Sequence, residues 1–278
     1  MPLTITDGAL PWQRLAVKNA HPRDERITFE ESTHSYTIDG IKEGWTSCTT
    51  FIGGFYEHFD ADKIISKMMN SSKWPSSKYF GMTADEIKAK WNANGEEASA
   101  AGTRMHLDIE HYNNAEPVGN LEDDEWEPNP GPEWDYFLAY DKKWRQRKGF
   151  SPYRTEWLVF KEDIKLAGSI DMVYKKSDGT LAIYDWKRVK ELKTENSFQS
   201  MKSPIEHLPD TNYWHYTLQL NIYKRILEEL YNVTVSELAL VILHPDNNTY
   251  KIAKLNILDD EIDAMFEVRK EIVNKQKS

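Results

Sequence analysis

The stretch Leu166–Lys187 reads LAGSIDMVYKKSDGTLAIYDWK and consists of two apolar runs on either side of a short polar segment. The polar segment Ser177-Asp178-Gly179 fits a three-residue β-hairpin loop, because its final glycine can adopt the left-handed backbone conformation. This loop would pair Lys176 with Thr180. A two-residue Asp178-Gly179 turn is the alternative, and it would shift the register of the strands by one residue.

The three-residue loop brings two carboxylates together. In its register Asp171 lies directly opposite Asp185 and Ser169 lies opposite Lys187, and we expect all four side chains on one face because strand side chains alternate. Two carboxylates about 5 Å apart repel each other by roughly 3 kcal/mol at an effective dielectric constant of about 20. Such a pair requires a shared proton or a cation, and a divalent metal is the simplest solution.

The preceding strand would add a third carboxylate. Tyr153–Lys161 reads as a strand, and a four-residue loop at Glu162–Lys165 would place Glu156 beside Asp171. Ligands that are all oxygen favour Mg²⁺ or Mn²⁺ over Zn²⁺. The alternative is a solvated hairpin face with scattered charges. Asp171 and Asp185, however, lie within apolar runs, where carboxylates without a partner are uncommon.

These residues resemble the PD-(D/E)xK nucleases and, within them, the RecB-like exonuclease branch. Five elements occur in the order of that branch: Gly102-Thr103-Arg104-Met105-His106, Glu156, Gly168-Ser169-Ile170-Asp171, Asp185-Trp186-Lys187, and the pair Gln219 and Tyr223. The chain is also similar to the mitochondrial genome maintenance exonuclease and to related phage and viral enzymes. One departure is that Ile170 stands before Asp171, where the family name has a proline; the RecB-like branch often lacks that proline.

The resemblance implies an α/β fold in which helices flank a mixed central β-sheet, the restriction-endonuclease-like core, with an added helical subdomain. It implies hydrolysis of phosphodiester bonds with Mg²⁺ or Mn²⁺. The metal ligands would be Asp171, Asp185, the carbonyl of Trp186 and His106, with Glu156 as a further acidic residue. Lys187 would orient the attacking water or offset phosphate charge, while Gln219 and Tyr223 would position the nucleic acid. Without the resemblance, His106 reads as a structural histidine, and Gln219 and Tyr223 read as ordinary helix surface.

The expected activity is that of a DNA exonuclease acting on single strands, in DNA replication, repair or recombination, and of phage or viral origin. No zinc finger or other base-reading module is present, while ten tryptophans offer faces on which bases could stack. Two alternatives stay open. One is a structure-specific DNA endonuclease, and the other is a noncatalytic nucleic-acid-binding protein that retains the fold.

The formal net charge of −10 argues against broad binding to nucleic acid, so contacts must come from local basic patches. One candidate is the segment 142–148, whose proposed contacts are Lys142, Lys143, Trp144, Arg145 and Arg147. Cations beside a tryptophan suit phosphate contact and base stacking. Cations in the last turn of a helix also complement the helix dipole, which is an equally good explanation.

Three regions are expected along the chain. Residues 1–59 hold a hairpin near 26–38 and a helix from Ser47; residues 60–148 form a helical subdomain that contributes His106; residues 149–278 form the nuclease core. Within the second region we expect one helix capped at Thr83 and ending near Trp91, and another over 96–113, where Gly102 allows close packing. Residues 114–132 read as an acidic, proline-rich surface linker.

Composition excludes several other classes of protein. A single cysteine, Cys48, permits no internal disulfide and cannot ligate a four-cysteine iron-sulfur cluster. No apolar run reaches the length of a membrane span, and residues 1–26 resemble neither a signal peptide nor a transit peptide. We therefore expect a soluble intracellular protein, with a monomer favoured.

Overall fold

The computed structural model describes residues 11–121 and 126–277. Its centre is a six-stranded mixed sheet in the order β3-β5-β6-β7-β8, with β4 paired to β5. The strands are β3 (Thr46–Ser47), β4 (Ser151–Lys161), β5 (Leu166–Lys175), β6 (Leu181–Lys187), β7 (Val235–Ile242) and β8 (Lys251–Lys254). A separate hairpin pairs β1 (Ile27–Glu30) with β2 (Ser35–Ile38). The expected α/β fold with a mixed central sheet is confirmed.

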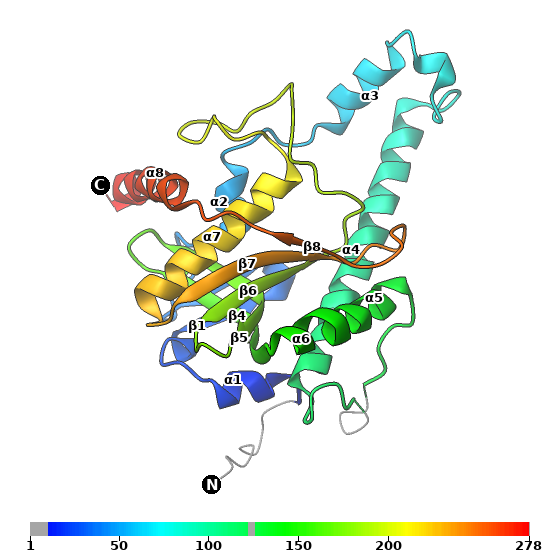
Figure 1. The fold of residues 1–278 in the computed structure, drawn as a ribbon. Coiled ribbons are helices and arrows are strands. Elements are labelled where there is room, and N and C mark those ends of the chain that lie inside the picture. The colour runs from blue at the N-terminus through cyan, green and yellow to red at the C-terminus, as the bar shows by residue number, and fades with distance from the viewer. Residues whose placement is uncertain (1–10, 122–125, 278) are drawn as a thin grey trace.

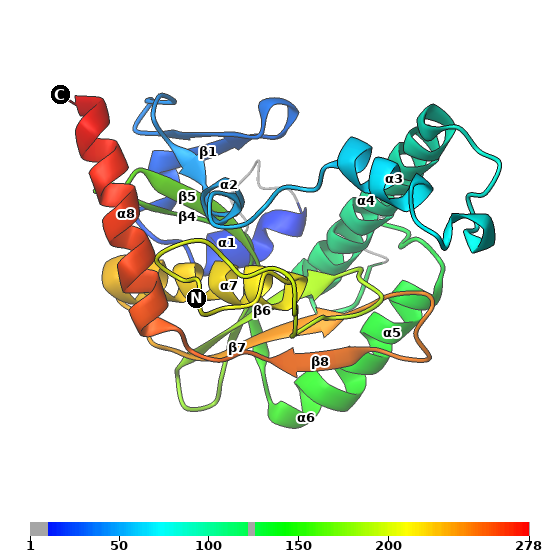
Figure 2. The same ribbon diagram turned by 90° about the horizontal axis from the view of Figure 1, so that it is seen from above.

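Helices cover both faces of this sheet (Figures 1 and 2). One apolar cluster joins the strands to α2 (Cys48–Gly53), α7 (Asn212–Leu230) and α8 (Asp259–Lys277). A second cluster joins them to α4 (Ala84–Asn114) and α5 (Pro132–Tyr140), and α5 continues through a π-helical turn into α6 (Gln146–Lys148). A short helix, α1 (Arg14–Lys18), packs near β4. In the described part of the chain no helix is both long and apolar enough to cross a membrane.

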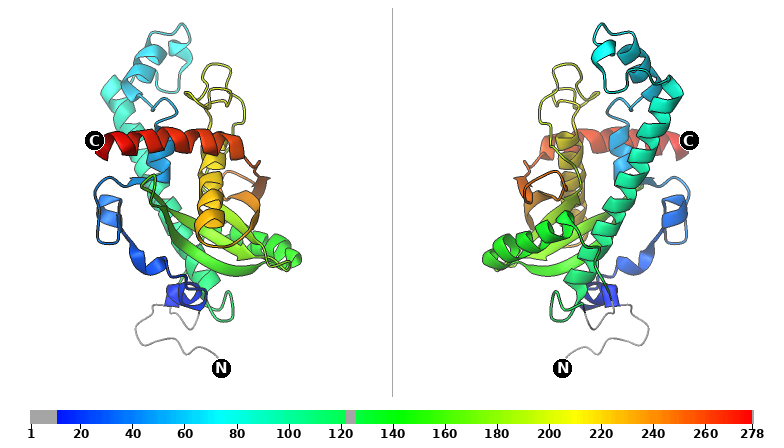
Figure 3. Two further views of the ribbon diagram at one scale, coloured as in Figure 1. Left: turned by 90° about the vertical axis from the view of Figure 1, so that its left-hand side faces the viewer. Right: turned by 90° about the vertical axis from the view of Figure 1, so that its right-hand side faces the viewer.

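An arm projects from this body (Figures 1 and 3). It consists of α3 (Ala61–Met69), the connection to α4, and the first half of α4. The second half of α4 belongs to the body, because Met105 and Ile109 share the second apolar cluster with the strands. Residues 92–100 of α4 are exposed on every side, so a solvated stretch of helix joins the arm to the body.

The expectation of two helices over residues 83–113 was wrong, since a single α4 of 31 residues spans the region. The predicted capping box is present: the Thr83 side chain accepts from the Glu86 amide, and the Glu86 side chain accepts from the Thr83 amide. Gly95 and Gly102 lie inside the helix, where each costs about 1 kcal/mol relative to alanine. Close packing does not explain Gly102, because a Cβ there would meet no atom within 4 Å.

Candidate active site

The hairpin that carries the two aspartates has the predicted register. The Lys176 amide donates to the Thr180 carbonyl, and Gly179 has a φ of +84°. The ladder runs from Lys175 paired with Leu181 to Met172 paired with Tyr184 and ends one residue before Asp171. Beyond that point the Trp186 amide donates to Asp171 Oδ2 at 3.1 Å. The hairpin thus opens at the aspartates and directs one carboxylate into the opening.

Strict alternation along β5 is interrupted at the same place. Ile170 and Met172 should share a face, yet Ile170 packs in the α7 cluster and Met172 in the α4–α5 cluster. On the neighbouring strand Trp157 pairs with Ile170 and Thr155 with Met172, while Glu156 between them has a φ of +42°. A local kink therefore interrupts the regular strands, at Asp171 in β5 and at Glu156 in β4. The expectation that four side chains share one face depends on regular alternation, which fails here.

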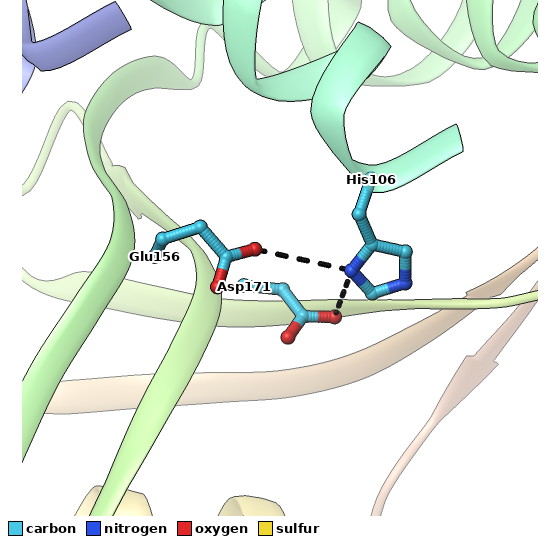
Figure 4. Close-up of side chains that lie close together, drawn as sticks. All are labelled: His106, Glu156 and Asp171. Atoms are coloured by element: carbon cyan, nitrogen blue, oxygen red, sulfur yellow. Dashed lines mark ion pairs between the residues drawn. The ribbon is translucent and has the colours of Figure 1, made fainter. Parts of the chain in front are cut away.

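Three groups from three elements converge at this kink (Figure 4). His106 from α4 places Nδ1 3.5 Å from Asp171 Oδ2 and 3.9 Å from Glu156 Oε1. The possible ligand atoms of these three residues all lie within 4.8 Å of one another. Ser169 Oγ donates to Glu156 Oε2 at 2.9 Å, which holds the carboxylate oxygen that does not face His106. One imidazole nitrogen and two carboxylates form a donor set suited to a divalent cation.

The second imidazole nitrogen has its own partner. His106 Nε2 lies 3.0 Å from the Trp186 carbonyl oxygen. When Nε2 carries the proton and donates it, Nδ1 is left to face the carboxylates. The Trp186 carbonyl keeps a second lone pair, but it contacts the imidazole at Nε2, whereas the two carboxylates lie at Nδ1.

Asp185 and Lys187 form a charged pair beside the cluster. Asp185 is 2% exposed, and its Oδ2 lies 2.6 Å from Lys187 Nζ. This contact is an ion pair without good hydrogen-bond geometry, and the buried Oδ2 makes no other hydrogen bond. Lys187 Nζ also lies 4.8 Å from the centre of the Tyr216 ring. Asp185 Oδ2 is therefore already paired with a cation, the Lys187 ammonium, and would have to leave it to ligate a metal.

The charged groups of the site shift one another's pKa values. Burial raises the pKa of Asp185 to about 6, and nearby Asp171 adds to the shift. Burial likewise raises the pKa of Asp171, although His106 and Lys187 partly offset it. Burial lowers the pKa of His106, but Asp171 and Glu156 outweigh it and bring the value to about 9. Burial also acts to lower the pKa of Lys187, while Asp185 and Asp171 raise it more. Without a metal, both His106 and Lys187 are cations at neutral pH.

Helix α7 packs against strands β4, β6 and β7 of the sheet that carries the site. Gln219 Nε2 donates to Tyr223 Oη at 3.1 Å, so the two predicted residues are in contact. Tyr223 is only 3% exposed. It therefore cannot contact nucleic acid as predicted, and its hydroxyl instead holds Gln219 in place. A Cβ on Gly168 would come within 2.5 Å of the Tyr223 ring and 3.0 Å of Cys48 Sγ. Gly168 is therefore required for the close approach of α7 to β5.

The predicted basic segment is largely occupied by internal contacts. Arg145 pairs with the buried Asp141 and donates to the Phe150 carbonyl. The Trp144 indole donates to Tyr184 Oη at 3.0 Å. These contacts hold α5 and α6 on the sheet, and they leave Lys142, Lys143 and Arg147 as the exposed members of the predicted set.

Two further residues near the site were not among the predicted site residues. Burial, with Glu156 adding to it, raises the pKa of Glu110 to about 8. It lies one turn after His106 on α4, and this spacing is the signal that could have identified it. Tyr216 packs against Lys187 and lies one turn before Gln219 on α7.

A family model and some solved structures match this chain. Residues 132–276, just over half of the chain, match the family model described as the PD-(D/E)XK nuclease superfamily. Among solved structures, SSO0001 is similar at 13% identity and a TM-score of 0.25, over 49% of this chain and 56% of its own length. A candidate exonuclease from Eubacterium rectale is similar at 14% identity and a TM-score of 0.33, over 83% of this chain and 79% of its own. No curated protein sequence matches.

Proposed function

Since this chain belongs to the PD-(D/E)XK nuclease superfamily, we propose that it is a divalent-metal-dependent deoxyribonuclease that degrades single-stranded DNA from an end. We also propose that it belongs to the RecB-like branch. The convergence of His106, Glu156 and Asp171 beside the Asp185–Lys187 pair is the observation that supports this function best.

The residues present fit Mg²⁺ or Mn²⁺. His106, Glu156 and Asp171 offer three ligand atoms, and Asp185 Oδ2 would join them by leaving its contact with Lys187. The Trp186 carbonyl is a further candidate ligand, and its contact with Nε2 orients His106. A divalent cation held there would lower the pKa of a bound water and stabilise negative charge on the phosphate.

Lys187 would act as a fixed positive charge. Its raised pKa keeps it protonated at neutral pH, so it would orient the attacking water or hold a phosphate oxygen and would not accept the proton of the water. Gln219 would face the strand, while the buried Tyr223 would hold Gln219 in place. The exposed Lys142, Lys143 and Arg147 stay candidates for phosphate contact.

The substrate is tested with end-labelled linear single-stranded DNA, linear duplex, circular single-stranded DNA and a matched RNA strand. Each is incubated with Mg²⁺, Mn²⁺ or EDTA. We expect metal-dependent loss of the linear single strand while the circle survives. Cleavage of circles would indicate an endonuclease, preference for the RNA would contradict the DNA assignment, and binding without cleavage would indicate a noncatalytic protein.

A further inference from the structure

The tip of the arm has a charge unlike that of the rest of the chain. Residues 63–84 contain no aspartate or glutamate, in a chain whose formal net charge is −10. Four lysines fall within this segment: Lys63, Lys67, Lys73 and Lys78. The segment runs from α3 to the first residue of α4 and forms the projecting end of the arm (Figure 1).

These lysines are available to a partner. All four are exposed, and none forms an ion pair with a carboxylate among the residues that the structure describes. The two acidic residues at the start of α3 are already engaged. Asp60 caps α3 by accepting from the Lys63 amide at 2.9 Å, and Asp62 pairs with Lys88 of α4 at 2.7 Å. At the start of α4, Glu86 is held in the Thr83 capping box while Asp85 is exposed, so the positive surface is confined to residues 63–84.

Aromatic side chains lie among the same lysines. Phe59 is 71% exposed and Phe80 is 59% exposed, although large aromatic side chains are usually buried. Trp74 and Phe80 meet edge to face at 6.0 Å, and Lys78 Nζ lies 4.9 Å from the centre of the Tyr79 ring. The arm has a small core of its own in the buried Ile65 and Ile87. Phe59 also meets Trp91 at 5.8 Å and Phe80 meets Trp74, yet more than half of each phenylalanine stays exposed.

The same helix links the tip to the active site. His106 lies 22 residues after Ala84 on α4, which corresponds to about 33 Å along the helix axis at about 1.5 Å per residue. A strand whose reacting end lies at His106 could follow the arm outward to its tip. Lysines suit the phosphates of such a strand, and exposed rings suit its unpaired bases.

We propose that the tip of the arm is a second contact for the unpaired part of the nucleic-acid substrate, several nucleotides from the bond that is cleaved. This inference rests on the proposed nuclease function. Its partner is single-stranded nucleic acid, since stacking on Phe59 and Phe80 requires bases that are free of a complementary strand.

The test measures binding of a labelled oligonucleotide of about 30 nucleotides to the full-length protein in EDTA, by fluorescence anisotropy at several salt concentrations. The variant is K73E/K78E, and the matched control is K18E/K175E, which makes the same charge change at exposed lysines far from the arm. We expect the arm variant to bind about tenfold more weakly or worse, with a salt dependence shallower by about 1.4 or more, because each lost phosphate contact removes about 0.7 from the slope. The control should bind like the wild type.

Phe80→Ala tests the aromatic part separately. It should weaken binding about fivefold or more while leaving the salt slope unchanged, because stacking releases no counterions. The same oligonucleotide in duplex form should bind with little dependence on Phe80. Circular dichroism verifies that each variant is folded.

Several results would overturn the inference. These are wild-type binding by K73E/K78E, an equal loss in K18E/K175E, or an equal effect of Phe80→Ala on duplex and single strand. Because the readout is binding in EDTA, it is independent of cleavage. Loss of binding in an arm variant would support the inference even if the wild-type protein cleaved nothing, and unchanged binding by an active nuclease would defeat the inference alone.

Discussion

Lys187 lies beside the proposed centre, where it pairs with the buried Asp185. We predict that Lys187→Ala lowers the rate of DNA cleavage by at least about 100-fold, because a fixed charge that stabilises the transition state is lost. Single-stranded DNA should still bind, since the proposed contacts at Gln219, Lys142, Lys143 and Arg147 are unchanged. Single-turnover cleavage of an end-labelled strand measures the effect.

Lys175→Ala is the matched control for this variant. Lys175 is exposed at the far end of the same hairpin, and its loss should leave the rate unchanged. A Lys187→Ala protein that cleaves at the wild-type rate would remove Lys187 from the site.

The close contacts around Gly168 predict how much stability an added methyl group would cost. Gly168→Ala should destabilise the fold by about 1–3 kcal/mol, because its Cβ would overlap the Tyr223 ring and crowd Cys48. Gly102→Ala, at an open position inside α4, should raise stability by up to about 1 kcal/mol. Urea unfolding of both variants measures the difference. Equal effects of the two changes would contradict the close approach of α7 to β5.

His106 links metal binding to pH. Its pKa of about 9 in the metal-free protein means that Nδ1 must lose a proton before it can ligate a cation. Apparent affinity for Mn²⁺ should therefore rise by about tenfold per pH unit between about pH 7 and about pH 9, and level off above that. Below about pH 6 protonation of Asp185 should weaken binding further.

Isothermal titration in buffers of different ionisation enthalpy should show release of close to one proton per Mn²⁺ at pH 7. His106→Ala should lose both this release and the slope above pH 7. Retention of the full release in His106→Ala would show that the proton comes from another group.

At the scale of elements, the kink in β4 fixes the direction of a ligand. Glu156 adopts a left-handed backbone conformation that is costly for most residues other than glycine and asparagine. We predict that Glu156→Asn leaves thermal stability equal or slightly higher, while metal affinity and cleavage fall because one carboxylate is gone. Glu156→Val should instead lose about 1 kcal/mol or more of stability, since a β-branched residue disfavours this conformation. Equal stability of the two variants would argue against the strain.

Local rules were sufficient to predict some of these elements. The register of β5 and β6 follows from a three-residue loop ending in glycine, and the Thr83 cap follows from its spacing to Glu86. The kink at Glu156 did not follow, because it depends on packing between β4, β5 and α4. The burial of Tyr223 also depends on tertiary contact, since it results from a glycine on another element. The pairing of Arg145 with Asp141 was missed because the composition of segment 142–148 does not show whether its cations are free or are paired with an acid outside the segment.

At the scale of the whole molecule, the sheet and its helices bring three distant segments to one point. Helix α4 contributes His106, β4 contributes Glu156, and the opening between β5 and β6 contributes Asp171. The fold class could be predicted from the order of strands and helices and from the resemblance. The arm could not, because nothing local in α4 shows where it leaves the body.

Binding of Mn²⁺, followed by the loss of its free electron-paramagnetic-resonance signal, tests the proposed metal centre most directly. The wild-type protein should bind Mn²⁺ at the cluster, and Asp171→Asn should abolish this binding, because the carboxylate closest to His106 loses its charge. Asp163→Asn, at an exposed carboxylate in the β4–β5 loop, should bind like the wild type. A wild-type protein that binds no Mn²⁺, or an Asp171→Asn protein that binds it equally well, would contradict the assignment of this cluster as the metal centre of a nuclease.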